Sequence, residues 1–445
     1  MRREILMPPV TPSMTDGKIA RWHVAEGQSV AAGDLLVEVA TPTATLEIEA
    51  EGEGRVERIL VPAGTEGVKV NTPIAILLGE ARAPGPGLAQ PLGFASLEPP
   101  LRREGLRASP RHGSGAVGAD GALLSYREAL RDALTAEMEA DETVFVIGVD
   151  VAQNRGAPTV TQGLVDAFGP SRVVAVPALD EAVLGMAVGA AFAGLRPVVA
   201  LASWGRTLET LAPVLTSAAQ TFYLSGGRLP VPVVFRGPNG LSAGVTGEDA
   251  RCVAAALARI PGLKIAQPAT PSAAKVLLQA AIRDSGPVAV LEHEQLYAIR
   301  EVVPDADTGT LGVARIARTG TDVTLAAAGH AVVVALEAAA VLARDGIDME
   351  VVDLMCVRPL DRDAVAASVV RTGRLVTLED GWGDLGLGAE IVASVAERGL
   401  RNLLSAPLRI TGAPVPMPYA PELQALAVPG VEHVARAVAA LVRGS

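Results

Sequence analysis

Two pairs of neighbouring acidic residues stand out as groups that could do chemistry in this sequence of 445 residues. Asp180 and Glu181 come just before the apolar stretch AVLGMAVGAAFAGL, and Glu248 and Asp249 lie in the stretch VTGEDARC. A carboxylate can move a proton when a reacting group lies within hydrogen-bond distance. Acids also stabilise the first turn of a helix, and an acidic pair in a loop can simply be solvated. Both interpretations stay open for each pair.

Other reactive side chains are scarce. Cys252 and Cys356 are the only cysteines, which gives neither a disulfide framework nor a cysteine metal cluster. The sequence therefore predicts no metal site. The histidines are spread along the chain, as His23, His112, His293, His330 and His433.

The charge and the hydropathy pattern exclude several classes of partner. The formal net charge of −11 argues against nucleic acid and against anionic membranes. No uncharged apolar run is long enough to cross a bilayer, and the stretch MRREILMPPV lacks the apolar core of a signal peptide. We therefore expect a cytoplasmic protein of two to four domains that binds neither nucleic acid nor membranes.

Residues 1–80 have the pattern of a small β domain. The stretch LLVEVATPTATLEIEA alternates apolar and polar residues on both sides of a short turn, which predicts a hairpin of two strands. The sequence EGQSV at 26–30 is repeated in similar form as EGVKV at 66–70, so the domain is expected to contain two similar halves. Residues 81–121 are rich in Pro, Gly and Ser without periodicity, which predicts a flexible linker.

The remainder alternates apolar strands with helices. Strands such as TVFVIG, PVVALAS and VAVLEH are separated by helical segments such as YREALRDALTAEMEAD, which Ser125 can cap. This alternation predicts a parallel α/β sheet over 122–300. A second α/β block over 316–445 contains the strands DVTLAAAG, DMEVVDL and RLVTLED.

The amino-acid sequences and the order of these segments resemble those of one known family. The stretches AVGAAFAGLRP, VFRGPNGLSAGV and TLEDGWGDLGLGAE resemble the beta subunit of the thiamine-diphosphate-dependent decarboxylase of 2-oxo acid dehydrogenase complexes, above all pyruvate dehydrogenase. Residues 1–80 resemble a lipoyl domain. The resemblance implies a multidomain fold, with an N-terminal all-β lipoyl- or biotinyl-like barrel-sandwich followed by two α/β domains. These would be a transketolase-like pyrimidine-binding domain and a transketolase C-terminal-like domain.

The same resemblance implies which partners are needed. In this family the beta subunit binds the pyrimidine half of thiamine diphosphate, and an alpha subunit binds the diphosphate and Mg. The Gly-Asp-Gly signature of the alpha subunit is absent from the sequence, so an alpha subunit must act in trans, in an alpha2-beta2 heterotetramer. The further partners implied are a dihydrolipoyl acyltransferase core and a small 2-oxo acid substrate.

Two of the family's catalytic positions are substituted. The glutamate that protonates the aminopyrimidine falls at Asp180, which is one methylene shorter, and Glu181 is one residue out of register. The family histidine that handles the reaction intermediate falls at Asp249, an anion at neutral pH if its pKa is the ordinary value of about 3.9. No histidine is close enough in sequence to replace it.

Other positions that face the cofactor in this family are also substituted. Trp204 and Arg206 occupy the places of two aromatic residues that pack on the pyrimidine, and Trp204 is expected to stack there. Asp150 follows Val149 where the family has two glutamates, and Ala273 replaces a carboxylate of a cation-holding loop.

The hairpin tip lacks its modification site. The family lysine that carries lipoate falls at Thr43, after Pro42, and a hydroxyl cannot form that amide. No covalent lipoate is therefore expected. The resemblance implies a decarboxylase beta subunit of altered or reduced activity, and a catalytically inactive, regulatory or scaffolding beta-like subunit is the alternative.

Overall fold

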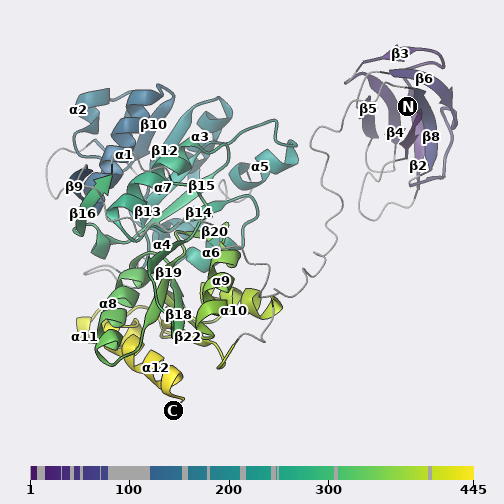
Figure 1. Ribbon diagram of the computed structural model, residues 1–445. Helices are drawn as coiled ribbons and strands as arrows, with labels where there is room; N and C mark the ends of the chain where they lie inside the picture. Colours follow the sequence, from purple (N-terminus) through teal and green to yellow (C-terminus); the bar gives the residue numbers. More distant parts are fainter. Residues whose placement is uncertain are drawn as a thin grey trace. The chain divides into compact units, whose positions relative to one another are not determined.

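The chain forms two compact units, residues 1–95 and residues 96–445, in a computed structural model (Figure 1). The described residues are 2–7, 16–31, 33–40, 45–50, 54–70, 72–78, 121–152, 159–177, 181–210, 217–241, 247, 250–304, 309–398 and 403–444. The segment predicted as a linker lies outside them, except for Gly121. The domain limits 1–80, 122–300 and 316–445 stay predictions.

The first unit is a sandwich of two four-stranded sheets, with strand orders β1-β8-β6-β3 and β5-β4-β2-β7. Alternate side chains of both sheets fill one apolar core, in which Ile19, Leu36 and Ile74 are almost completely buried. The strands are β1 (Arg2–Leu6), β2 (Asp16–Trp22), β3 (Ser29–Val30), β4 (Leu35–Ala40), β5 (Thr45–Glu49), β6 (Gly54–Ile59), β7 (Val68–Lys69) and β8 (Pro73–Leu78).

The hairpin predicted for this unit is confirmed, whereas the similarity of the two halves lies at other residues than the repeated sequences. Strands β4 and β5 form the predicted antiparallel hairpin, with Ala40 opposite Thr45 across its tip. The two halves make similar turns at Ala25–Gln28 and Pro62–Thr65, in which Gly27 and Gly64 have φ angles of 84° and 86°. The repeated sequence EGVKV follows the second turn, so it is not equivalent in structure to EGQSV. Each turn is followed by a two-residue strand, β3 or β7. Glycine suits both places because it has no Cβ to clash there.

The second unit begins with an α/β domain around a seven-stranded sheet of order β11-β10-β12-β13-β15-β14-β20. Its pairs are parallel except for the last, as the alternating pattern predicts. The elements of this part are β9 (Gly121–Ser125), α1 (Tyr126–Ala140), β10 (Val144–Gly148), α2 (Leu164–Phe168), β11 (Val173–Ala175), α3 (Glu181–Phe192), β12 (Arg196–Ala200), α4 (Trp204–Thr207), η1 (Leu208–Thr210), α5 (Ala219–Leu224), β13 (Val234–Pro238), α6 (Ala254–Ala258), β14 (Lys264–Ala266), α7 (Pro271–Arg283), β15 (Val288–Glu292), η3 (Glu294–Leu296) and β16 (Arg300–Pro304).

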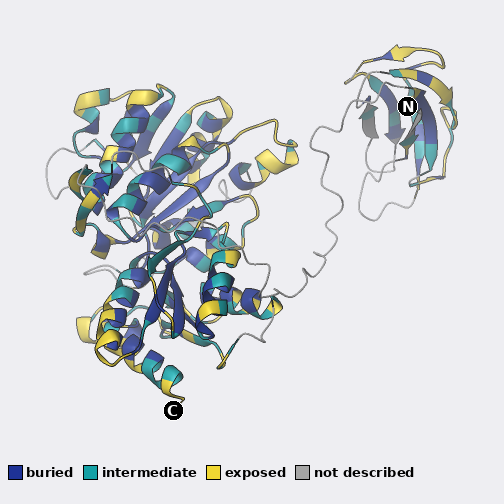
Figure 2. Cartoon of the chain, in the orientation of Figure 1, coloured by how far each residue is buried: buried dark blue, intermediate teal, exposed yellow. Residues whose placement is uncertain are grey.

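The C-terminal domain is built on a five-stranded sheet of order β17-β19-β18-β21-β22. Buried strands form the centre of each α/β domain and helices cover them (Figure 2). The elements are β17 (Arg315–Arg318), β18 (Val323–Ala327), α8 (His330–Arg344), β19 (Met349–Asp353), β20 (Cys356–Arg358), α9 (Arg362–Thr372), β21 (Leu375–Trp382), α10 (Leu387–Glu397), β22 (Leu408–Gly412), α11 (Pro421–Ala427) and α12 (Val431–Arg443).

Strand β20 joins the two α/β domains. It belongs to the C-terminal part of the chain, but it pairs antiparallel with β14 at the edge of the first sheet. Arg358, at the end of β20, donates a hydrogen bond of 2.7 Å to the carbonyl of Ala258. The two sheets are therefore held in one body, and a cavity between them has fixed walls.

One described helical span, Pro421–Arg443, is long and apolar enough to cross a membrane by length and composition alone. It consists of α11 and α12, and α12 packs Val434, Ala435 and Val438 into the core of the C-terminal domain. An amphipathic helix that covers a core gives this signal as readily as a membrane span does.

Candidate functional site

A cavity of about 420 Å³ lies between the two α/β domains of the second unit. One wall comes from the segment 251–256 at the start of α6, and the opposite wall comes from the end of β21 and the following turn. The lining residues are Leu208, Arg251, Cys252, Val253, Ala254, Ala255, Ala256, Arg259, Gln267, Ala328, Leu378, Glu379, Asp380, Gly381, Trp382, Asp384, Leu385 and Leu387.

Asn239 positions the first wall. Its side chain follows the buried strand β13 and is itself buried, with an exposed fraction of 3%. The Oδ1 atom accepts a hydrogen bond of 2.8 Å from the backbone of Val253, and Nδ2 lies 3.5 Å from Sγ of Cys252. Residues 252–253 are thus fixed to the end of the central sheet.

Glu379 positions the second wall. Its carboxylate accepts hydrogen bonds from the backbone N–H groups of Leu387 (2.9 Å) and Gly388 (3.0 Å), at the start of α10. These N–H groups have no partner inside the helix, so the carboxylate satisfies them. Burial raises the pKa of Glu379 in spite of these hydrogen bonds. The neighbouring Asp380 is left facing the cavity.

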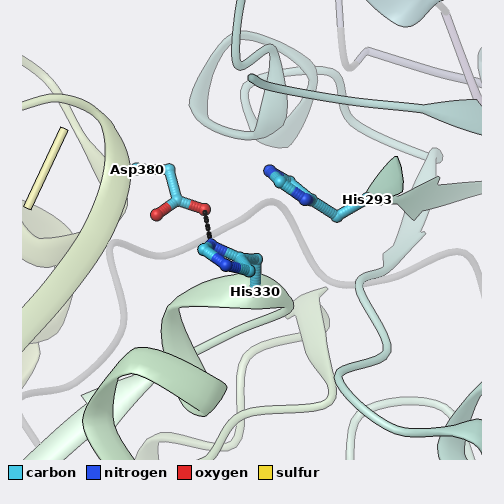
Figure 3. Close-up of side chains that lie close together, drawn as sticks. All are labelled: His293, His330 and Asp380. Carbon is cyan, nitrogen blue, oxygen red and sulfur yellow. Dashed lines mark ion pairs between the residues drawn. The ribbon is translucent and has the colours of Figure 1, made fainter. Parts of the chain in front are cut away.

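Asp380 belongs to a cluster with two histidines (Figure 3). Nδ1 of His330 lies 3.6 Å from Oδ2 of Asp380, and the rings of His293 and His330 are stacked with centroids 4.5 Å apart and planes 12° from parallel. One nitrogen or oxygen atom from each residue lies within 4.8 Å of the other two.

The pKa values in this cluster move in defined directions. Burial lowers the pKa of His293 to about 4, although the charge of Asp380 opposes that shift. Burial alone would raise the pKa of Asp380, but the interaction with His330 and the charges of both imidazoles outweigh it and lower the pKa. Near neutral pH the cluster therefore holds a neutral His293 beside an ionised Asp380.

The sequence did not predict this cluster, yet it contains a signal for it. Each member follows a buried strand at its carboxyl end: His293 follows β15, His330 comes three residues after β18, and Asp380 lies near the end of β21. Carboxyl ends of parallel strands are where α/β sheets place their sites. Distance along the sequence does not reveal that His293 lies beside Gly240, because this proximity depends on how the sheet is assembled.

Trp204 is a residue of the apolar core. Its side chain is completely buried in the apolar cluster under β12 and β15, and its Nε1 donates a hydrogen bond of 3.2 Å to the carbonyl of Val290. The ring therefore offers no free face in this structure. Arg206, two residues further along α4, is exposed instead.

Asp150 lies in an exposed turn after β10 and has a positive φ of 60°. Glu181 is the first residue of α3, which agrees with the helix-opening interpretation of its acidic pair. Ala273 is buried in the first turn of α7. Asp180, Asp249 and Thr43 lie outside the described residues, so their roles stay predictions.

The described residues fit thiamine diphosphate in part. The strands whose ends frame the predicted pyrimidine site are formed. Gly148 allows β10 to lie close to β12, because a Cβ at this position would approach the Ala200 carbonyl to 2.6 Å. The buried Trp204 ring, however, provides no stacking surface.

Family comparisons match three parts of the chain. The model described as "Transketolase, pyrimidine binding domain" matches residues 123–300, and "Transketolase, C-terminal domain" matches residues 312–434. The model "Biotin-requiring enzyme" matches residues 3–77. These matches confirm the predicted fold class.

Curated relatives and a solved structure agree with these matches. "Pyruvate dehydrogenase E1 component subunit beta" of Rhizobium meliloti (strain 1021) is 43% identical over 454 residues, which cover 98% of this chain and 99% of that protein. The mitochondrial beta subunit of Mus musculus is 44% identical over 71% of this chain and 89% of its own length.

A solved structure described as "Split gene transketolase, inactive beta4 tetramer" superposes with a TM-score of 0.61 at 22% identity, over 72% of this chain and 99% of that one. That likeness supports the fold alone. Because a relative 43% identical spans nearly the whole chain, the chain belongs to the family of pyruvate dehydrogenase E1 component beta subunits.

Proposed function

We propose that this chain is the beta subunit of a pyruvate dehydrogenase-like, thiamine-diphosphate-dependent 2-oxo acid decarboxylase of altered or reduced activity. The observation that carries the proposal is the 43% identity over 98% of the chain, which includes both α/β domains and the N-terminal β unit. The proposed partners are an alpha subunit in an alpha2-beta2 heterotetramer and a dihydrolipoyl acyltransferase core. The proposed location is the cytoplasm, and nucleic acid and membranes are not proposed as partners.

The division of labour follows from the family. Thiamine diphosphate, when bound, supplies the carbanion-stabilising chemistry that decarboxylation needs. In this proposal the alpha subunit holds the diphosphate and Mg, and this chain holds the pyrimidine beside Asp180. Asp180 reaches less far than a glutamate and Asp249 offers a carboxyl group in place of an imidazole, so in this proposal proton transfer is slower than with the family residues.

A catalytically inactive beta-like subunit is the second candidate. The specific observation that favours it is the burial of Trp204, which removes a stacking surface at a position where the family has an aromatic residue. In this alternative the chain assembles with an alpha subunit or with the acyltransferase core and regulates or scaffolds the complex.

The N-terminal unit is proposed to carry no lipoate. Lys18 is held by Glu66 at 2.7 Å in strand β2, and Lys69 ends the short strand β7, so neither lies at the β4–β5 hairpin tip. The unit would then serve as an unmodified β module.

One experiment separates the two candidates. The chain is purified with an alpha subunit and loaded with thiamine diphosphate and Mg, and decarboxylation of pyruvate and branched-chain 2-oxo acids is measured with an artificial electron acceptor. We expect turnover that Asp180→Ala abolishes, with the isolated chain inactive. A loaded and assembled complex without turnover would establish the inactive subunit instead.

A further inference from the structure

The cluster of His293, His330 and Asp380 has the geometry of an acid–base group more than of a metal centre. A metal ion bound to an imidazole lies near the plane of that ring. Two rings that are stacked 4.5 Å apart and only 12° from parallel share no such position. The three side chains would have to turn before one ion could contact them all.

The hydrogen bond of His293 leads to the same conclusion. Nδ1 of His293 accepts a hydrogen bond of 3.3 Å from the backbone N–H of Gln295. The proton of the neutral ring is therefore on Nε2, so neither nitrogen is available as a ligand without a rearrangement. A histidine that binds a metal usually donates a proton from its second nitrogen instead.

Asp380 sets the tautomer of His330. Its Oδ2 atom faces Nδ1 of His330 at 3.6 Å, an ion-pair distance slightly longer than a hydrogen bond. A carboxylate at this place favours the proton on Nδ1, so the lone pair of Nε2 is left to accept a second proton. The side chain of His330 is 22% exposed, and its partner Asp380 lines the cavity, so the pair lies at the cavity wall.

His293 covers one face of the His330 ring. It is 6% exposed, and burial lowers its pKa, so a neutral ring stacks on His330 near pH 7. Gly240 lies beside His293, and its φ of 86° is what favours glycine there, since a Cβ 3.4 Å from Cδ2 of His293 would make only an ordinary contact. The neutral ring thus shields His330 without adding a competing charge.

The cluster borders the predicted site. Asp380 lines the cavity together with Leu208 and Arg251. Leu208 is two residues from Arg206, and Arg251 is two residues from Asp249. The cavity therefore adjoins both segments from which the sequence predicts cofactor-facing residues.

We propose that His330, paired with Asp380 and covered by His293, is an acid–base group beside the cavity between the two α/β domains, connected to it through Asp380, and that it takes the role of the histidine that is missing at position 249. This role rests on the proposed function. His330 takes up one proton at Nε2 from the reacting 2-oxo acid system and later returns it, so no further reactant is consumed.

The first test measures turnover in the complex with an alpha subunit. We expect His330→Gln to lower kcat by roughly 100-fold and to remove one limb of the kcat–pH profile. Asp380→Asn should lower kcat in the same direction. His433→Gln is the matched control, because His433 is exposed on α12, and it should leave kcat unchanged. A kcat for His330→Gln within about twofold of the unmodified complex would overturn the proposal.

The pH profile is interpreted through the variants because other charged groups also face the cavity. Glu379, Asp384, Arg251 and Arg259 line it along with Asp380. A limb that disappears in His330→Gln but persists in His433→Gln belongs to the proposed group. A profile that keeps both limbs in His330→Gln would assign the titration to one of these neighbours and contradict the proposal.

A second test does not depend on activity. The isolated full-length chain is treated with diethylpyrocarbonate, and the modification rate of each histidine is followed by peptide mass. Asp380→Asn should slow the reaction of His330 several-fold while that of His433 stays the same. If the reaction of His330 slows in Asp380→Asn and the complex shows no turnover, the proposed function is contradicted, but the interaction between His330 and Asp380 is supported. An unchanged His330 rate would contradict the pair.

Zinc binding distinguishes the metal alternative. Calorimetric titration of the full-length chain with Zn²⁺ should show no site that depends on the cluster. Saturable binding of one ion per chain, lost in each of His293→Asn, His330→Gln and Asp380→Asn, would replace the acid–base proposal with a metal centre.

Discussion

Arg236 and Glu292 form a buried ion pair in the first α/β domain. Nε of Arg236 donates a 2.5 Å hydrogen bond to Oε1 of Glu292, its Nη2 pairs with Oε2, and both side chains are almost completely buried. The hydroxyl of Tyr297 donates to the same carboxylate at 2.7 Å. Burial alone would lower the pKa of Arg236, but the charge of Glu292, the hydrogen bonds to it and the neighbouring Tyr297 and Tyr126 together outweigh burial and raise the pKa.

Removing one charge of this pair should be costly. Glu292→Gln leaves the guanidinium buried without a counter-charge, so we expect the free energy of unfolding to fall by about 3–5 kcal/mol. Urea denaturation measures this change. The double variant Arg236→Met with Glu292→Leu is the control and should recover most of the loss. A loss below about 1 kcal/mol for Glu292→Gln would contradict the account of a desolvated pair.

His293 should make stability depend on pH. Its pKa is about 4 in the folded chain against an ordinary value of 6.5, because burial disfavours the charged ring. Between these values the unfolded chain takes up a proton that the folded chain does not. Stability should therefore fall as pH drops from about 6.5 to 4, by up to about 3 kcal/mol.

Urea denaturation of the full chain between pH 7 and pH 4.5 tests this dependence, with His293→Asn as the comparison. Asp380 has a lowered pKa, so its contribution is lost below its ordinary value of 3.8, under this window. The side chains of His330 and Asp380 are unchanged in the variant. An equal pH slope in the two proteins would contradict the burial argument.

At the scale of elements, local patterns predicted structure where local contacts decide it. Ser125 and Glu128 form the reciprocal capping box that starts α1, with hydrogen bonds of 3.2 Å and 2.7 Å, as Ser125 in the sequence indicated. Gly27 and Gly64 make similar turns in the two halves of the first unit, and both are glycines at positive φ. These features depend on residues a few positions apart, so the sequence contains them directly.

Features that depend on distant pairing were not predictable. Strand β20 crosses from the C-terminal part to pair with β14, and only three residues form it. The direction of the Trp204 ring depends on β15, to which its N–H donates across 86 positions. The histidine cluster likewise joins three strand ends. A single sequence contains each of the three residues, but it does not indicate which strand ends lie together in the fold.

The β4–β5 hairpin provides a test at this scale. After expression with a lipoyl ligase and lipoate, the intact mass of the chain should show no lipoyl adduct, because Thr43 has no amine. Thr43→Lys, with Pro42→Asp if required, should restore the adduct, since the hairpin around the tip is formed. An adduct on the unmodified chain within residues 1–80 would contradict the interpretation of an unmodified module.

At the scale of the whole molecule, the chain combines a β unit with a body of two α/β domains. Strand β20 fixes the two α/β domains to each other, and the interdomain cavity collects groups from both. His293 comes from the first domain, and His330 and Asp380 come from the second. Any motion between the domains would therefore separate the cluster, so its chemistry depends on the intact body.

The central claim is that this beta subunit keeps the family fold but performs its chemistry with altered acid–base groups. The most direct measurement is the initial rate of 2-oxo acid decarboxylation by the complex with an alpha subunit, thiamine diphosphate and Mg, for the unmodified chain and for the double variant Asp180→Glu with Asp249→His. The account predicts a rate at least about tenfold higher for the double variant. An equal or lower rate for the double variant would contradict it.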